Sequence, residues 1–213
     1  MTIRRLTLGL VALPLLSSLV FAQSASSNSS QRSATPDPGE ISNNVYRNPF
    51  FGFSYRIRYG WVDRTDEMKD ASNDPSKASV LLGIFERPPQ ATGSTVNSSV
   101  VVAAERTSAY PGLKSAAQYF GPISEVTEAK GMKPVNEPYE FPVDGQAIVR
   151  RDFVKQVSGV GMHQSTLAML SKGYVLSFTF IGSSDDEVQQ MIEWLRFGTP
   201  AKSAKNSSKS PKS

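Results

Sequence analysis

Alternation of apolar and polar residues marks the first strong structural signal in the chain. Every second residue from 51 to 59 is apolar, whereas Arg56 and Arg58 occupy the positions between them. A period of two is the period of a β-strand that buries one face. The pattern predicts a strand that ends at Gly60-Trp61, with Trp61 at the edge of the core. Its buried face should comprise Phe51, Phe53, Tyr55, Ile57 and Tyr59.

Several later segments are also predicted to be strands. Residues 79–85 and 98–104 are apolar on both faces, as expected of central strands that are covered on both sides. Residues 146–157, 163–171 and 174–181 follow one another closely, and the connections at 158–161 and 172–173 are short enough to require antiparallel pairing. Pro134 and Pro138 restrict residues 132–140 to an edge strand at best.

Three segments are predicted to be helical. Residues 63–74 form a short charged helix, and residues 114–130 form a longer one that Gly121-Pro122 should kink or divide. The third begins at Ser184, because Ser184 and Glu187 have the spacing of a capping box in which each side chain bonds the backbone N–H of the other. The acidic residues Asp185, Asp186 and Glu187 also suit the helix dipole. The buried stripe of this helix should comprise Val188, Met191, Ile192 and Leu195.

Together these elements predict an α+β fold class. We expect one meandering antiparallel β-sheet of about seven strands, with the long helix and the C-terminal helix packed on it. The domain should extend from residue 45 to 198. Residues 23–44 and 199–213 contain too few large apolar residues to offset the entropy cost of ordering, so a disordered linker and a disordered basic tail are predicted.

The N-terminal residues 1–22 have the three parts of a secretory signal peptide. Arg4 and Arg5 precede a short apolar run, and Val20 and Ala22 provide small residues before a cleavage point. The run contains Pro14 and is shorter than the roughly 20 residues of a membrane span. We therefore expect cleavage after Ala22 and export to the periplasm or the extracellular space, with an uncleaved anchor as the alternative.

Composition and charge narrow the class of partner. The chain has no cysteine, so neither disulfides nor a lipid on an N-terminal cysteine can stabilise or anchor it. Residues 23–200 contain 17 Lys and Arg against 19 Asp and Glu, which gives a net charge of −2. The basic surplus of the whole chain therefore lies in its terminal segments, which argues against a nucleic-acid-binding domain. Because the leader is expected to be cleaved and no cysteine is present for a lipid, no stable membrane anchor is expected.

Two stretches of the chain resemble PsbP-like and DcrB-like exported domains. Asn48-Pro49-Phe50-Phe51-Gly52-Phe53-Ser54-Tyr55, followed by Gly60-Trp61, resembles the start of these domains, and residues 174–195 resemble their last strand and helix. The likeness covers residues 45–197 and departs at Ile57-Arg58-Tyr59, where members often have Tyr-Pro-x. The resemblance implies a sheet sandwiched by helices. It also implies a binding or assembly module, because members include a photosystem subunit and bacterial envelope proteins, and it carries over no site.

No residue pattern predicts a catalytic, metal or cofactor site. His163 is the single histidine and lacks nearby ligands or a nucleophile motif, so it is interpreted as a packing or surface residue. Residues 185–187 are explained as a helix start, and they lack the alternating ligands and the glycine of a calcium loop. Gly159-Val160-Gly161 is interpreted as a hairpin turn and not as a phosphate-binding loop.

Arginines on two predicted strands form the candidate binding site. They could line a patch for an anion or a partner, although arginines on exposed strands also serve to discourage aggregation. The candidate residues are Arg56, Arg58, Arg150, Arg151, Tyr55 and Tyr59.

The preferred hypothesis is a non-catalytic exported module that binds an envelope or extracellular protein. One alternative is a small-ligand carrier with a pocket lined by the aromatic residues around Trp61. The other is a hydrolytic enzyme or enzyme subunit that uses carboxylates such as Glu105, Glu140 or Asp152, although no spacing in the sequence places two of them together.

Overall fold

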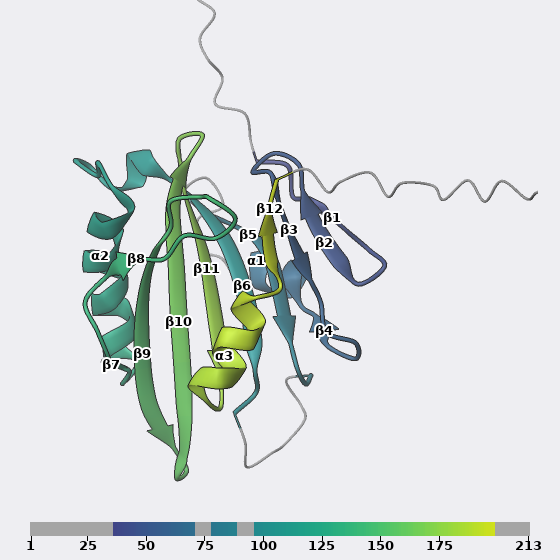
Figure 1. Cartoon of the computed structure of the whole chain (residues 1–213), viewed down its shortest axis with the longest axis vertical. Coiled ribbons are helices and arrows are strands. Elements are labelled where there is room, and N and C mark those ends of the chain that lie inside the picture. The colour runs from purple at the N-terminus through teal and green to yellow at the C-terminus, as the bar shows by residue number, and fades with distance from the viewer. Residues whose placement is uncertain (1–35, 71–77, 89–95, 199–213) are drawn as a thin grey trace, which may run out of the picture. The chain divides into compact units, whose positions relative to one another are not determined.

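The computed structural model describes residues 36–70, 78–88 and 96–198 (Figure 1). Several predictions lie outside these residues: the signal peptide at 1–22, the linker as far as residue 35, and the tail at 199–213. The end of the first charged helix, at 71–74, and most of the loop before residue 96 also lie outside them.

The larger of two sheets forms the middle layer of the fold. All of its strand pairs are antiparallel, and it contains each strand that was predicted from residue 79 onward. Its order is β4 (Val62–Asp63), β5 (Ala78–Phe85), β6 (Ser99–Arg106), β11 (Tyr174–Gly182), β10 (Val160–Ser171), β9 (Val149–Val157) and β7 (Lys133–Pro134), with β8 (Tyr139–Glu140) also paired to β9.

The smaller sheet brings the two ends of the described chain together. Its order is β1 (Glu40–Ser42), β2 (Val45–Asn48), β3 (Phe53–Arg56) and β12 (Leu195–Phe197), and all pairs are antiparallel. The α+β class with antiparallel sheets is confirmed, but the prediction of one sheet is wrong. The apolar pattern identifies which face of a strand is buried and does not specify which strand pairs with which.

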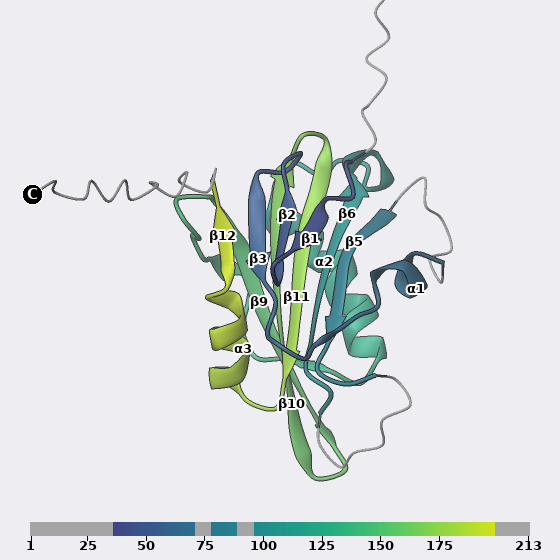
Figure 2. The same ribbon diagram turned by 90° about the vertical axis from the view of Figure 1, so that its right-hand side faces the viewer.

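Both faces of the larger sheet are covered (Figures 1 and 2). Helix α2 (Ala116–Ala129) packs on one face, where Tyr119 and Phe120 contact Ala168 and Val175. The smaller sheet and α3 (Asp185–Ile192) lie on the other face, and α1 (Thr65–Asp70) packs beside β5. Because apolar residues project from both faces of β6, β10 and β11, covering both faces removes them from water.

Aromatic side chains fill the space between the two sheets. Phe178 of β11 is fully buried and contacts Phe53 of β3 at 5.1 Å between ring centroids and Phe197 of β12 at 5.9 Å. Tyr55 packs against Phe180 at 6.1 Å. The predicted inward direction of Phe53 and Tyr55 is therefore confirmed on the inner face of the smaller sheet, whereas Phe51 and Ile57 are buried just outside β3, which is shorter than predicted.

Tyr59 departs from this alternating pattern. It is 93% exposed, and β3 ends at Arg56, so the prediction that Tyr59 faces the core is wrong. Gly60 has φ +84°, a left-handed conformation that glycine adopts without strain, and the chain turns there towards β4. Trp61 is half-buried against the core, in agreement with its predicted place at the edge.

The C-terminal helix is shorter than predicted. Helix α3 ends at Ile192, and Leu195 begins β12, although all four predicted stripe residues are buried. The Ser184 hydroxyl accepts from the Glu187 N–H at 3.2 Å, as predicted. The Glu187 carboxylate, however, accepts from the N–H and hydroxyl of Ser183 instead of the N–H of Ser184.

Helix α2 continues through Pro122, so a division into two helices is wrong. The proline removes one intrahelical hydrogen bond, and the helix is otherwise supported by burial of Tyr119 and Phe120 against the sheet. Residues 132–140 form only the two-residue edge strands β7 and β8, which agrees with the effect expected of the two prolines.

The two predicted hairpins are confirmed, and one is tighter than expected. Ser158-Gly159 alone joins β9 to β10, because β10 already begins at Val160. Lys172-Gly173 joins β10 to β11, and both residues of each connection have positive φ values of 51–81°. Two consecutive positive values define the type I′ turn that suits the twist of paired strands.

The folded part also begins earlier than residue 45. Residues 40–42 form β1 and pair with residues 45–47 of β2, and the Tyr46 hydroxyl donates to the Pro38 carbonyl at 2.7 Å. Composition did not reveal this strand, because Ile41 is the only large apolar residue that it contains.

Two buried tyrosines of the smaller sheet give a matched stability test. The Tyr55 hydroxyl has no hydrogen-bond partner among the described residues, whereas the Tyr46 hydroxyl also accepts from Asn48 at 3.0 Å. Tyr55→Phe should therefore raise the free energy of unfolding by up to about 1 kcal/mol, and Tyr46→Phe should lower it by about 1 kcal/mol. Urea unfolding measures both changes. An equal loss of unfolding free energy in the two variants would contradict the predicted difference between the two hydroxyl groups.

Candidate functional site

The structure separates the six predicted binding residues. Arg150 and Arg151 are neighbours on β9, but their side chains lie on opposite faces of the larger sheet. Arg150 donates to Gln189 of α3 at 2.9 Å, and Arg151 donates to Ser124 of α2 at 2.6 Å. The Arg150 guanidinium also lies over the Phe141 ring, and the Arg151 guanidinium lies over the Phe153 ring. Both arginines are therefore occupied by internal contacts.

The other four predicted residues belong to β3 or to the segment that follows it. Tyr55 is fully buried, so its side chain cannot contribute to a surface patch. Arg58 is exposed, and its charge acts on Glu187 at the start of α3. Arg56 is exposed on the outer face of the smaller sheet, and Tyr59 is exposed beyond the end of β3.

Two further arginines lie beside Arg56 on that outer face. Ser54 of β3 is paired in register with Arg47 of β2 on one side and with Arg196 of β12 on the other. Residues opposite one another in an antiparallel pair project from the same face, and Arg56 projects there too because it lies two positions after Ser54. We call Arg47, Arg56 and Arg196 the basic face; its strands lie in front in Figure 2.

The basic face has few internal contacts. Arg47 donates to the Ser42 carbonyl at 3.4 Å, and Arg196 donates to its neighbour's carbonyl, that of Leu195, at 2.8 Å. Within the described part of the chain, none of these three arginines forms an ion pair with a carboxylate. Glu40 lies opposite Arg47 on β1 and therefore projects from the same face beside it, although no ion pair joins the two. Arg56 and Arg196 are exposed on this face, so their guanidinium groups are available to an external anion.

The alternation of residues 46–48 could have identified Arg47 as a surface residue of a strand. It could not have shown which residues lie beside Arg47 in the folded protein. Tyr46 and Asn48 are buried and Arg47 lies between them, as expected of a strand with one buried face. Arg196 carried no such signal, because the residues before it were interpreted as a helical stripe. The pairing of β12 with β3 brings together residues about 140 positions apart.

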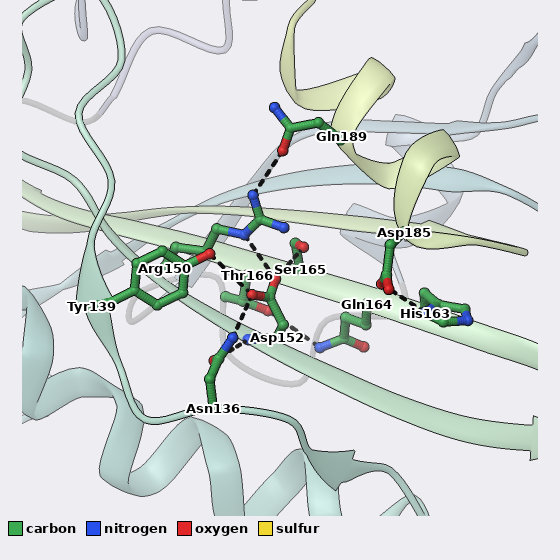
Figure 3. Close-up of polar contacts among 10 residues, drawn as sticks. All are labelled: Asn136, Tyr139, Arg150, Asp152, His163, Gln164, Ser165, Thr166, Asp185 and Gln189. Carbon is green, nitrogen blue, oxygen red and sulfur yellow. Dashed lines mark hydrogen bonds and ion pairs between the residues drawn. The ribbon is translucent and has the colours of Figure 1, made fainter.

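A network of polar side chains surrounds Asp152 (Figure 3). One carboxylate oxygen, Oδ1, accepts from Arg150 Nε at 2.7 Å and from the Ser165 hydroxyl. The other, Oδ2, accepts from Asn136 Nδ2 at 2.7 Å and from the Tyr139 hydroxyl at 3.1 Å. These donors come from β9, β10, β8 and the segment before β8, so the carboxylate joins three strands.

Donors on every side make Asp152 a structural carboxylate. Burial alone would raise its pKa, but the hydrogen bonds from Ser165, Asn136 and Arg150, together with the Arg150 charge, hold the pKa below its usual value. The side chains of Arg150 and Asp152 are only 11% and 15% exposed. A general base needs a free lone pair directed at a substrate, and this carboxylate directs its lone pairs at protein donors.

His163 and Asp185 form the nearest approach to a catalytic pair. His163 Nδ1 lies 2.7 Å from Asp185 Oδ1, and Ser165 is two residues further along β10. His163 Nε2 lies over Gly161, however, 3.0 Å from where a Cβ would stand. Ser165 donates to Asp152 instead, so the three residues do not form the nucleophile–base contact of a triad.

The remaining candidate carboxylates are also separated. Glu105 of β6 accepts from the Tyr119 hydroxyl of α2 at 2.5 Å and from the Tyr110 hydroxyl, which places it on the α2 face of the sheet. Asp152 lies on the α3 face. Glu140 is exposed and borders a cleft of about 490 Å³ between the start of α2 and the β8–β9 connection. The structure therefore pairs none of the three carboxylates.

Of the aromatic residues near Trp61, Phe53 borders an open groove of about 250 Å³ beside Arg47 and Ser54, and the others pack into the core. Phe51, Phe53 and Tyr55 are buried in the core between the sheets, and Trp61 packs against that core. Ligand binding at these residues would require the core to open. The small-ligand alternative therefore gains no support from the aromatic residues on which it was based.

Two carboxylates with lowered pKa values predict acid sensitivity. Burial opposes ionisation of Glu187, but hydrogen bonds from Ser98 and Ser183 and the Arg58 charge lower its pKa, and the pKa of Asp152 is lowered as well. Their contribution to stability is therefore complete above the unfolded-state pKa of about 4 and is lost as the pH falls through the folded-state values.

Thermal unfolding between pH 7 and pH 3 tests this dependence. The unfolding temperature should decrease once the pH is lowered below about 4. In the Asp152→Asn variant, the unfolding temperature should depend less on pH in this range. Glu125→Gln removes an exposed carboxylate from α2 and is the control. An equal flattening in the control, or a midpoint that rises with acid, would contradict the assignment.

The described ranges contain neither a metal-binding cluster nor a helix suited to span a membrane. No group of three or more His, Asp or Glu side chains in them is arranged to hold a metal ion. None of the helices formed by those residues combines the length and the apolar composition that a membrane crossing needs.

Comparison with known proteins finds solved structures of limited similarity. No family model and no curated protein sequence matches the chain. A PsbP protein (CyanoP) of the cyanobacterium Synechocystis is 13% identical and aligns with a TM-score of 0.49, over 75% of this chain and 98% of its own. LpqN of Mycobacterium tuberculosis, described as involved in cell envelope biogenesis, is 13% identical with a TM-score of 0.37. The alignment covers 76% of this chain and 87% of LpqN.

A protein of unknown function from Pseudomonas aeruginosa is 18% identical with a TM-score of 0.36, over 58% of this chain and 79% of its own. The α+β fold of the chain is established by its own antiparallel sheets and helices, and these alignments, all with TM-scores below 0.5, add nothing about its role. At these identities the likeness concerns the fold alone.

Proposed function

We propose that this chain is an exported, non-catalytic binding module that attaches to an anionic partner in the envelope or outside the cell. One observation carries the proposal: Arg47, Arg56 and Arg196 share an outer sheet face without a carboxylate partner in the described part of the chain. Arginine is suited to external anions because its planar guanidinium group offers several donors at once.

The distribution of the acidic residues supports a binding role over a hydrolytic one. Asp152 and Glu105 are bonded to internal donors, and they lie on opposite faces of the larger sheet. A pair of carboxylates that cooperate in hydrolysis would have to face one cleft. Export is supported by the signal-peptide pattern of residues 1–22, and nucleic acid is disfavoured as a partner by the net acidic charge of residues 23–200.

Retention on native envelope material tests the binding role. The protein should sediment with envelope fractions at low salt and be released at high salt, because exposed charges are screened. Combined Arg47→Gln, Arg56→Gln and Arg196→Gln should reduce retention by about tenfold or more.

The matched control removes the same amount of charge from positions outside the smaller sheet. Lys114 and Lys130 flank α2 and Lys133 lies on β7, and all three are exposed. Their replacement by glutamine should leave retention nearly unchanged. Equal retention of the arginine variant and the control, or no retention at any salt concentration, would refute the proposed function.

A further inference from the structure

We propose that the cleft of about 490 Å³ beside the end of β10 binds an extended segment of a partner polypeptide, which pairs with free strand backbone there as an added strand. We call it the β9–β10 cleft; its lining includes Ala116, Glu140, Ala147, Val149 and Leu170. It lies outside the basic face, so the inference goes beyond the proposed function and does not depend on it.

Strand β10 continues beyond its pairing with β9. The last pair of their ladder is Ala168 with Val149, although β10 extends to Ser171. In the same register Leu170 would lie opposite Ala147, but Ala147 precedes the start of β9. No backbone hydrogen bond joins these two residues in the part of the chain that the structure describes. The sheet therefore opens into the cleft at this point.

Two-residue turns fix the direction of the Leu170 backbone groups. Val157 and Val160 flank the turn between β9 and β10, so they exchange both of their backbone hydrogen bonds. The direction of bonding alternates along a strand, so every second residue of β10 from Val160 to Leu170 directs its N–H and C=O towards the β9 side. The other turn agrees, because Ser171 and Tyr174 bond each other on the β11 side. The Leu170 N–H and C=O therefore face the cleft.

Ala147 presents a matching pair of backbone groups from the opposite wall. Val143 and Gln146 exchange both backbone hydrogen bonds, at 2.9 and 3.3 Å, across a two-residue turn. Gln146 thus bonds on the β8 side, and the next residue, Ala147, directs its N–H and C=O to the other side, towards β10. A strand placed between Leu170 and Ala147 therefore finds one donor and one acceptor on each side.

The β8–β9 connection is held away from β10 by contacts near the smaller sheet. The Phe197 N–H of β12 donates to Asp144 Oδ2 at 2.9 Å. The Phe141 ring packs against the core between the sheets, and the Arg150 guanidinium lies 4.9 Å from its centroid. These contacts keep the cleft open in the free protein, so binding does not have to supply the energy of opening it.

The walls of the cleft suit apolar side chains of an added strand. Ala116 and Ala147 border it with small side chains, which leaves room for a second chain. Val149 and Leu170 lie on the α2 face of the sheet, where they pack against the cluster around Phe120. The cleft volume falls within the range of about 300–1,000 Å³ that is typical of ligand sites. We therefore expect alternate residues of the bound segment to be apolar.

Glu140 supplies the charge at the rim. It is the only charged residue among the described residues that line the cleft, and it is exposed. It pairs in register with Val149, so it projects from the same α2 face, and it forms no ion pair with another described residue. A lysine or arginine of the bound segment complements this carboxylate. A polypeptide also matches the backbone groups of both walls, because strand addition uses main-chain hydrogen bonds for affinity.

Amide hydrogen exchange in the free full chain, followed by NMR, tests the backbone geometry. The Ala168 N–H is bonded to β9, so it should exchange about 100-fold or more slowly than the N–H groups of Leu170 and Ala147. Equal protection of Leu170 and Ala168 would mean that the ladder continues or that the chain fills its own cleft, and either result would overturn the inference.

Peptide selection tests the occupant. A phage-displayed library of random octapeptides is first depleted on the Ala147→Trp variant, whose added ring fills the cleft from an exposed position, and is then selected on the wild-type chain. We expect the enriched peptides to contain a lysine or an arginine. They should slow amide exchange at Leu170 and Ala147 about tenfold or more. Failure to enrich any sequence, or enrichment of peptides that leave both amides unprotected, would overturn the inference.

Synthetic copies of the enriched peptides locate the contact. Ala147→Trp should weaken their affinity about tenfold or more, and Glu140→Gln should weaken it about threefold. Ala117→Trp and Glu125→Gln are the matched controls, because both positions are exposed on α2 and lie outside the cleft lining. The controls should change affinity by less than about twofold.

Equal effects in the matched pairs would refute binding at the β9–β10 cleft. Loss of the three arginines of the basic face should leave peptide affinity unchanged, and a loss of affinity there would place the peptide on the basic face instead and overturn the inference. Envelope retention reports on the basic face alone, so the proposed function and this inference fail or stand separately.

Discussion

Replacing Asp152 with alanine is expected to lower the free energy of unfolding by about 3 kcal/mol. The loss follows from four donors that point at one carboxylate: Arg150, Ser165, Asn136 and Tyr139. Without Asp152, the Arg150 guanidinium keeps its charge while its side chain remains 11% exposed. An ion that is left buried without its partner costs more than the pair contributed.

Urea unfolding followed by circular dichroism measures this change. The control is Asp66→Ala, which breaks the ion pair with Lys69 on α1, where the Asp66 side chain is 92% exposed. That variant should lose less than about 0.5 kcal/mol. A similar small loss for Asp152→Ala would show that the carboxylate is not held as the structure indicates, and its assignment as a structural group would fail.

Phe178→Ala is expected to destabilise the protein by about 4 kcal/mol. Phe178 is fully buried between the two sheets, and it contacts one ring from β3 and another from β12. Its removal leaves a cavity at the point where the smaller sheet packs on the larger one. The basic face depends on this contact, because the same two strands carry Arg56 and Arg196 on their outer side.

Tyr59→Ala is the matched control, since it removes an aromatic ring that is 93% exposed. Its free energy of unfolding should change by less than about 0.5 kcal/mol. Phe178→Leu, which retains most of the apolar volume, should lose less than Phe178→Ala. If Phe178→Ala and Tyr59→Ala had equal effects, the packing of the two sheets would be contradicted.

The sequence predicted local structure well wherever one physical signal dominated. The hairpins at Ser158-Gly159 and Lys172-Gly173 follow from glycine in two short connections. The start of α3 follows from Ser184, whose hydroxyl accepts from the Glu187 N–H. Such signals act within a few residues, so tertiary contacts did not override them.

Predictions failed where a residue fits two patterns or where pairing is not local. Leu195 has the spacing of the α3 stripe, yet it lies in β12, since an apolar residue satisfies either element. β1 was missed because its stability comes from pairing with β2 and not from apolar content. Nothing in a one-dimensional pattern indicates that residue 54 lies beside residue 196.

Only part of the candidate site was predicted, because the sequence pattern does not show which distant strands pair. Arg56 was correctly assigned to an outward face, because that follows from alternation alone. Arg150 and Arg151 were grouped with it by residue type, whereas adjacent residues of a strand project from opposite faces. Arg47 and Arg196 become neighbours of Arg56 only after the smaller sheet has formed.

A photo-crosslinking residue at position 54 tests the central claim most directly. Ser54 lies between Arg47 and Arg196, so a crosslinker there reports whatever contacts the basic face in the native envelope. We predict an adduct at position 54 that is lost in the triple arginine variant, and none at the exposed position 117 of α2. Adducts of equal yield at both positions, or an adduct at 54 that survives loss of the three arginines, would contradict the claim that this face binds an anionic partner.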